Sequence, residues 1–412
     1  MTTKQKLSDV IQVNPRRQLK KGNIAPFVAM ENIVPYEKQI SEYTQRKISG
    51  SNSKFKNGDT LLAKITPSLE NGKTVFVDFL KKNEIGHGST EFFVLCGKEN
   101  QILDQFVYYL MRTSEFREEA IRSMTGTSGR QRVQETVFDD YEIILPTISI
   151  QEKISKPLSD LDAKIQNLRN QNRILEQMAQ AIFKSWFVDF DGVTEFEDSE
   201  LGQIPKGWKI KTIEELVNHQ KGFVFKSVDY QTHGKRIIRI SDLTKDSIDL
   251  QNCLFIDEKK VQEQKYQSVI LNENDIVITT VGSNLNHPES AVGRPIRVPT
   301  FATGSLLNQN MVRLRCINPD LQLFLLKNIQ HAKFIDYLSA RTQGSANQAS
   351  ITLGVIFDYS ILLPNNENLL KNFSVISESI YQKINKNQIQ IQSLTKTRDV
   401  LLPKLMSGEI RA

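Results

Sequence analysis

The tripeptide Gly72-Lys73-Thr74 is the part of this sequence most like a nucleotide-binding motif, because Gly-Lys-Thr closes the phosphate loop of many nucleotide-binding proteins. That loop also needs a glycine five residues before Gly72, and the chain has Pro67 there. No strong strand, loop and helix pattern surrounds the tripeptide. The sequence therefore does not predict a nucleotide site.

Other catalytic patterns are missing as well. The histidines are isolated from one another and from the cysteines, without the spacing of metal ligands: His87, His219, His233, His287 and His331. Pro319-Asp320 has no Glu-x-Lys or Asp-x-Lys downstream, as a metal-dependent nuclease would need, and the chain has no Asn-Pro-Pro-Tyr run of a DNA methyltransferase. We expect no catalytic residue, metal or cofactor in this chain.

Length and composition suggest a multidomain protein of the cytoplasm. A chain of 412 residues is too long for one ordinary core. It has no apolar run of the roughly 18 residues that a membrane span needs, and no signal-peptide pattern at its start. Cys96, Cys253 and Cys316 are scattered, as in a reducing compartment. A net charge of +6 points weakly to a polyanionic partner.

An internal repeat organises the chain. Residues 126–133 and 138–146 align without gaps on residues 344–351 and 356–364, at a shift of 218. Upstream, residues 55–66 match 271–282, and 27–33 resemble 237–243. Short apolar runs between Gly, Asn, Asp and Pro predict strands, and residues 101–124 and 320–338 have helical patterns. We expect an α+β fold of two repeated β-rich domains, each followed by a long helix.

The two long segments carry heptad seams, in which mostly apolar positions follow one another at steps of four and three, with Asn172, Ser377, Asn387 and Arg398 as polar members. In the first seam these are Ile154, Leu158, Leu161, Ile165, Leu168, Asn172, Leu175, Ala179, Ile182 and Trp186. In the second they are Phe373, Ser377, Ile380, Ile384, Asn387, Ile391, Leu394, Arg398, Leu401 and Leu405. The seams predict that the helices pair as a coiled coil.

Antiparallel pairing that matches the ends of both seams sets Asn172 opposite Asn387. A buried asparagine pair of this kind can fix helix register. The alternative is that each asparagine is merely tolerated on a partly solvated helix. Ser149 and Glu152, three residues apart, have the pattern of a capping box at the start of the first helix. Pro157 is expected to bend the second turn of this helix. Pro403 makes it undecided whether the second helix includes its last turn.

Five segments carry a resemblance to a known family. They are Ala-Ile-Phe-Lys-Ser-Trp-Phe-Val-Asp-Phe at 181–190, Glu-Leu-Gly-Gln-Ile-Pro-Lys-Gly-Trp at 200–208, Leu-Leu-Pro-Lys-Leu-Met-Ser-Gly-Glu-Ile at 401–410, Asn-Gln-Asn-Met at 308–311 and Gly-Ser-Thr-Glu-Phe at 88–92. In their order along the chain, these segments resemble those of the specificity subunits of type I restriction-modification enzymes, and the resemblance spans the whole chain.

The resemblance implies target-recognition domains at 1–148 and 191–365, a central helix and linker at 149–190, and a C-terminal helix at 366–412. Each domain would read one part of a bipartite site on double-stranded DNA. Two modification (methyltransferase) subunits would bind the helices and recruit restriction subunits, and S-adenosylmethionine, ATP and Mg would bind those partners. The first domain has no counterpart of Gly207-Trp208, and the two halves differ across most loops. An asymmetric target is therefore expected.

Candidate DNA-binding residues are loop side chains that can reach base edges or phosphates. In the first domain they are Lys64, Thr66, Ser68, Asn71, Lys73, Thr127, Ser128, Arg130, Gln131 and Arg132. In the second they are Thr280, Ser283, Asn284, Asn286, His287, Gln343, Ser345, Asn347 and Gln348. Such residues are also ordinary loop formers. Arg130 and Arg132 stand out, because arginine pairs with guanine or phosphate.

Two questions stay open at this point. Trp186 and Phe187 could stack on a base, although on a heptad helix packing is the simpler interpretation. A coiled-coil scaffolding protein with two protein-binding domains is the alternative to a DNA reader, and binding to random DNA would separate the two.

Overall fold

The chain forms two compact units in its computed structural model. The structure describes residues 4–40, 42–48, 50, 52–244, 247–250, 252–282, 292–345 and 348–410, without the side chains of 343–345 and 348. Unit 1 comprises the chain up to Arg169 and from Gln390 onward, and unit 2 runs from Asn170 to Ile389. Both boundaries fall inside long helices, so each unit contains a part of both.

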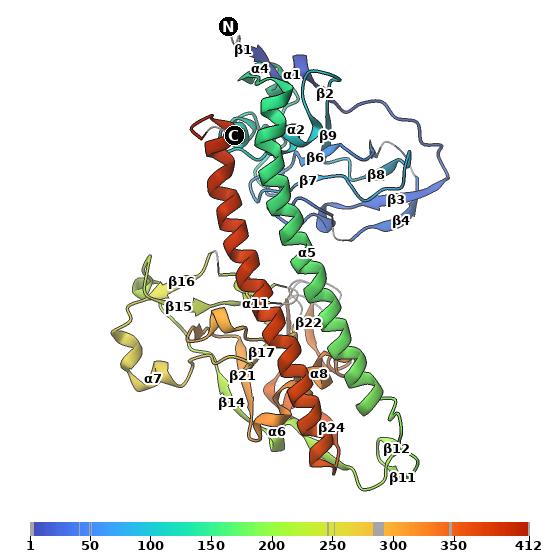
Figure 1. Ribbon diagram of the computed structural model, residues 1–412. Coiled ribbons are helices and arrows are strands. Elements are labelled where there is room, and N and C mark those ends of the chain that lie inside the picture. Colours follow the sequence, from blue (N-terminus) through green and yellow to red (C-terminus); the bar gives the residue numbers. More distant parts are fainter. Residues whose placement is uncertain are drawn as a thin grey trace. The chain divides into compact units, whose positions relative to one another are not determined.

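The globular part of unit 1 is built from short strands and helices (Figure 1). These are β1 (Lys4–Lys6), α1 (Leu7–Val10), β2 (Ile11–Val13), β3 (Ile24–Val28), η1 (Met30–Asn32), β4 (Thr44–Lys47), β5 (Ser53–Phe55), β6 (Thr60–Ala63), β7 (Thr74–Phe76), β8 (Gly86–Gly88), β9 (Phe92–Gly97), α2 (Asp104–Leu110), α3 (Ser114–Arg122), α4 (Val137–Asp140) and β10 (Glu142–Ile144).

Unit 2 has corresponding elements in the same order, with additions. They are β11 (Phe196–Ser199), β12 (Gly202–Pro205), β13 (Lys209–Thr212), α6 (Ile213–Leu216), β14 (Val217–Lys221), η2 (Ser227–Asp229), β15 (Lys235–Ile238), η3 (Ile240–Asp242), β16 (Leu254–Ile256), η4 (Lys260–Gln262), α7 (Gln264–Gln267), β17 (Ile276–Thr279), β18 (Val281–Gly282), β19 (Pro295–Arg297), η5 (Thr300–Ala302), β20 (Leu306–Leu307), β21 (Met311–Cys316), η6 (Pro319–Leu321), α8 (Gln322–Gln330), α9 (Ala332–Ser339), β22 (Gln343–Ser345), β23 (Gln348–Ser350), α10 (Leu353–Phe357) and β24 (Ser360–Leu363).

The sheets confirm the repeat. Unit 1 has an antiparallel sheet of order β2-β9-β6-β7, and unit 2 has β14-β21-β17-β19. The second sheet is β4-β3-β8-β5 in unit 1 and β16-β15-β20 in unit 2. Its parallel pair aligns Phe27 with His87 in unit 1 and Ile237 with Leu306 in unit 2. Ladders β1·β10 and β13·β24 also correspond.

The segments at 101–124 and 320–338, predicted to be helical, each contain two α-helices. Thr113 separates α2 from α3, because its side chain accepts a hydrogen bond from the amide of Phe116 and thereby caps the start of α3. His331 does the same for α9 through the amide of Lys333. The first residues of α2 and α8, and of α3 and α9, keep the shift of 218.

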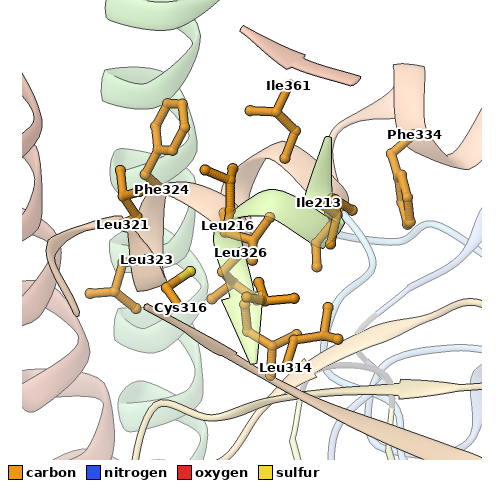
Figure 2. Packing of buried hydrophobic residues seen from close by; sticks show 14 of the residues in the cluster. Ile213, Leu216, Leu314, Cys316, Leu321, Leu323, Phe324, Leu326, Phe334 and Ile361 are labelled. Atoms are coloured by element: carbon orange, nitrogen blue, oxygen red, sulfur yellow. The ribbon is translucent and has the colours of Figure 1, made fainter. Parts of the chain in front are cut away.

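The central strands are buried on both faces, which explains their continuous apolar sequences. In β6, Leu61 faces the second sheet and packs with Val28 and Phe55, whereas Leu62 packs with the helices. In β17 the same alternation occurs: Val277 packs with residues of the second sheet, whereas Ile276 and Ile278 pack with the helices. Figure 2 shows part of the helix-side core of unit 2, where α6, α8 and β21 contribute side chains.

The two long helices are α5 (Ile148–Phe187) and α11 (Glu367–Met406). The register predicted from the asparagines is the one that the structure has: within unit 2, the Asn387 side-chain amide donates to Asn172 Oδ1 over 2.8 Å. Within unit 1, Arg398 of α11 pairs with Asp162 of α5 at 2.7 Å. Both contacts fit antiparallel helices, as predicted. The other predicted seam residues are buried or half-buried.

The predicted capping box at the start of α5 is wrong. The helix already begins at Ile148, and the amides of Ile150 and Gln151 donate to the carbonyl of Thr147. Ser149 therefore lies inside the first turn and is not the N-cap. Both helices continue through their prolines, Pro157 and Pro403. The sequence leaves the last turn of the second helix undecided at Pro403, and in the structure α11 extends three residues beyond this proline.

Candidate nucleic-acid interface

The two loops of unit 1 that carry the predicted DNA-binding residues lie against each other. Loop 64–73 follows β6, and loop 125–132 follows α3. An isolated bridge pairs Ile65 with Arg132, the amide of Thr66 donates to the carbonyl of Gln131 over 3.0 Å, and the amide of Val133 donates to the carbonyl of Lys64 over 2.8 Å. The fold thus gathers polar side chains from segments about 60 residues apart onto one surface.

Unit 2 joins the corresponding segments in the same way. The amide of Ile351 donates to the carbonyl of Thr280 over 2.9 Å, and β18 pairs with β23 so that Val281 lies opposite Ser350. Among the residues predicted here, Ser283, Asn284, Asn286, His287 and Asn347 lie outside the described residues, and the side chains of Gln343, Ser345 and Gln348 are not described. Those assignments stay predictions.

Several predicted side chains of loop 64–73 are engaged within unit 1. The Lys64 ammonium lies 5.4 Å from the ring centre of Phe93. Thr66 donates to Glu70 over 2.8 Å. Lys73 donates to the backbone carbonyl of Met30 over 2.8 Å. These contacts fix the shape of the loop, while Asn71 is exposed.

The two arginines of loop 125–132 differ in their surroundings. Arg132 makes two hydrogen bonds to the Glu91 carboxylate, of 2.9 and 2.8 Å. Hydrogen bonding from Arg132 holds the pKa of Glu91 below its usual range. Arg130 is exposed, as are Thr127 and Ser128. Of the pair, Arg130 is therefore the arginine whose donors are available to DNA.

We expect replacement of Arg130 by alanine to weaken binding to double-stranded DNA of any sequence. One lost phosphate contact would reduce the slope of log affinity against log salt concentration by about 0.9. Fluorescence anisotropy across a salt series measures this slope. Arg122→Ala is a matched control, because Arg122 is an exposed arginine of α3 already paired with Glu119. An unchanged slope in the double variant Arg130→Ala/Arg132→Ala would refute the loop assignment.

An open polar hollow of about 350 Å³ lies beside these loops and was not predicted from sequence. It opens where β3 and β8 end, and its lining includes Phe27, Met30, Glu31, Arg46, Ser89 and Thr90. The segment of Arg46 carries no motif, so nothing local marks it. The Gly88–Phe92 motif, which runs from the end of β8 to the start of β9, contributes Gly88, Ser89 and Thr90 to the lining.

Trp186 and Phe187 pack inside unit 2. The Phe187 ring centre lies 4.8 Å from that of Phe324 and 5.1 Å from that of Phe373, and only 6% of Phe187 is exposed. Trp186 lies edge-on to Phe373, with ring centres 6.4 Å apart. The packing interpretation is confirmed for both residues.

No group of three or more His, Cys, Asp or Glu side chains that could hold a metal occurs among the residues that the structure describes. The three cysteines are buried and unpaired with one another. Across the same described ranges, the helices include none long and apolar enough to span a bilayer.

Residues 3–177 match the model of the family described as the type I restriction modification DNA specificity domain. Relatives extend the match. The HindI specificity subunit of Haemophilus influenzae is 27% identical over 411 residues, covering 86% of this chain and 87% of the relative. The MjaVIII specificity subunit of Methanocaldococcus jannaschii is 24% identical over 418 residues, covering 98% and 93%.

The fold agrees with these matches. The crystal structure of a type I S subunit from M. genitalium superposes with a TM-score of 0.53 at 16% identity, covering 98% of this chain and 95% of that one. The resemblance to type I restriction-modification specificity subunits, inferred from the five sequence segments, is confirmed.

Proposed function

We propose that this chain is the DNA-reading subunit of a type I restriction-modification complex and carries no catalytic site itself. The observation that carries the proposal is the repeated surface. In each unit the loop after the central strand, β6 or β17, is held beside a second loop from the segment after α3 or α9. Two such surfaces suit a bipartite target, because each can contact one half-site.

Residues at equivalent positions support an asymmetric target. The amide of Lys64 donates to the carbonyl of Glu91 in unit 1, and the amide of Thr280 donates to that of Asn310 in unit 2. The backbone positions thus correspond while the side chains change from Lys to Thr and from Glu to Asn. Different donors and acceptors recognise different base edges. We therefore propose that the two half-sites have different sequences.

The helices support a role in spacing and assembly. A 40-residue helix is about 60 Å long, against about 34–36 Å for one turn of DNA. We propose that α5 and α11 set the spacing of the half-sites and bind two modification subunits, which recruit restriction subunits. S-adenosylmethionine, ATP and Mg would bind those partners, and the complex would act in the cytoplasm.

The decisive experiment is co-expression of this chain with its modification subunit, followed by sequencing of the DNA for modified bases. We expect methylation within one bipartite, asymmetric motif. The modification subunit expressed alone is the control and should leave that motif unmodified. Unmodified DNA from a complex shown to bind S-adenosylmethionine would count against the proposal. Filter binding to random DNA tests the scaffolding alternative, since a scaffold would not bind.

A further inference from the structure

The lining of the hollow in unit 1 is connected to both candidate loops. On one side, Lys73 of loop 64–73 donates to the carbonyl of Met30, a residue of the lining. On the other, Thr90 of the lining is followed by Glu91, which holds Arg132. A DNA segment that contacts both loops would therefore lie next to the hollow.

Arg46 is held in the hollow with its donors available. Its guanidinium lies 4.3 Å from the ring centre of Phe27, on the neighbouring strand β3. In the part of the chain that the structure describes, this guanidinium makes no hydrogen bond or ion pair. Stacking on an aromatic ring limits the conformations of an arginine while leaving its N–H groups at the edge free. Arg46 is thus prepared for bidentate binding.

Glu31 adds an acceptor to the same lining. It is exposed, and among the described residues it forms no ion pair with Arg46. A guanine offers two acceptors in the major groove, O6 and N7, and its cytosine partner offers the N4 amino donor. Arginine matches the guanine, and a carboxylate matches the cytosine. One lining therefore presents groups that complement both bases of a G·C pair.

We propose that this hollow reads one G·C base pair of the half-site bound by unit 1, with Arg46 donating to guanine and Glu31 accepting from cytosine. The inference rests on the proposed function. A phosphate contact is the less suitable occupant, because the Glu31 carboxylate would repel it. By strand pairing, Ile256 of unit 2 corresponds to Arg46, and Ile237 corresponds to Phe27. Unit 2 therefore has no arginine stacked on an aromatic ring at this position, and the proposed G·C contact applies to unit 1.

The test uses the full chain and duplex oligonucleotides that carry the motif found by methylation sequencing. Each position is substituted in turn in competition binding. Arg46→Ala should lose about 5- to 150-fold of the discrimination at one G·C position and leave the other half-site unchanged. Glu31→Gln should relax the same position. Lys82→Ala is the charge-matched control, since Lys82 is an exposed lysine before the opposite end of β8, and it should change no position.

Two results would overturn the inference. Arg46→Ala could keep every preference of the natural chain, or it could weaken all sequences equally with a smaller salt slope, as a lost phosphate contact would. If Arg46→Ala does not fold, Arg46→Gln carries the test, because glutamine favours adenine and should reduce discrimination against A·T there. A natural chain that directs no methylation would overturn the proposed function and this inference together, whereas a failure confined to Arg46 and Glu31 leaves the function standing.

Discussion

Replacing Asp162 by alanine is expected to lower the free energy of unfolding of unit 1 by about 3–5 kcal/mol, because it leaves a buried charge without its main partner. Asp162 and Arg398 form an ion pair of 2.7 Å, and their side chains are 4% and 3% exposed. The half-exposed Asp399, 2.8 Å from Arg398, would remain as its ion-pair partner. Urea unfolding followed by circular dichroism measures the loss.

The expected size of the effect depends on a wider buried network. Tyr109 of α2 donates to Asp162 over 2.7 Å, and Lys38 donates to Tyr109 and to Ser159 of α5. Burial works against the charge on Arg398, but Asp162 outweighs it and raises the pKa of Arg398 above its ordinary value. Asp162 thus connects α2, α5 and α11 within unit 1, and its loss would leave a tyrosine hydroxyl without its acceptor as well.

An exposed ion pair on the same helix is the control. Lys156 and Asp160 lie 2.9 Å apart with side chains more than half exposed, so Asp160→Ala should cost less than about 1 kcal/mol. Asp162→Ala should cost several times more. Equal losses in the two variants would mean that the buried network does not stabilise unit 1. Replacing both Asp162 and Arg398 by apolar residues of similar volume should cost less than Asp162→Ala alone, because no unpaired charge remains.

Much of the fold could be predicted because the sequence contains an internal repeat and two heptad patterns. The shift of 218 between the halves survives in the starts of α2 and α8 and in the order of the sheets. The heptad steps identified α5 and α11, and the polar positions Asn172 and Asn387 identified their register. Helix seams are local, so one sequence suffices to find them. The first residue of α5 could not be predicted correctly from the sequence, because Ser149 and Glu152 have the spacing of a capping box without lying at the helix end.

The candidate site was predicted only in part, since its chemistry depends on contacts between distant segments. Arg132 has the same residue type and loop setting as Arg130, yet Glu91, 41 residues away, occupies its donors. Arg46 became a candidate only because its guanidinium stacks on the ring of Phe27, which lies on the neighbouring strand β3. No local pattern reports either partner. Residue types selected the candidate loops, and the fold shows which of their arginines already has a partner within the protein.

Replacing Phe187 by alanine is expected to lower the free energy of unfolding of unit 2 by about 3–5 kcal/mol, the usual cost of emptying the place of a buried phenylalanine. Phe187 ends α5 and belongs to the main hydrophobic cluster of unit 2. Its ring contacts Phe324 of α8, Phe373 of α11 and Trp208, so the variant would leave a cavity where three segments meet. Urea unfolding of the full chain, with hydrogen exchange to assign the loss to unit 2, measures it.

Ile174→Ala on the same helix is the control, because Ile174 is half exposed and should cost less than about 1 kcal/mol. The comparison also separates packing from base stacking. If Phe187 only packs, the DNA affinity of the folded variant should stay within about 2-fold of the natural chain, since stacking on one base would be worth about 1–3 kcal/mol. A variant of unchanged stability that loses DNA affinity 5-fold or more would show instead that Phe187 contacts a base, and that the aromatic cluster opens when DNA binds.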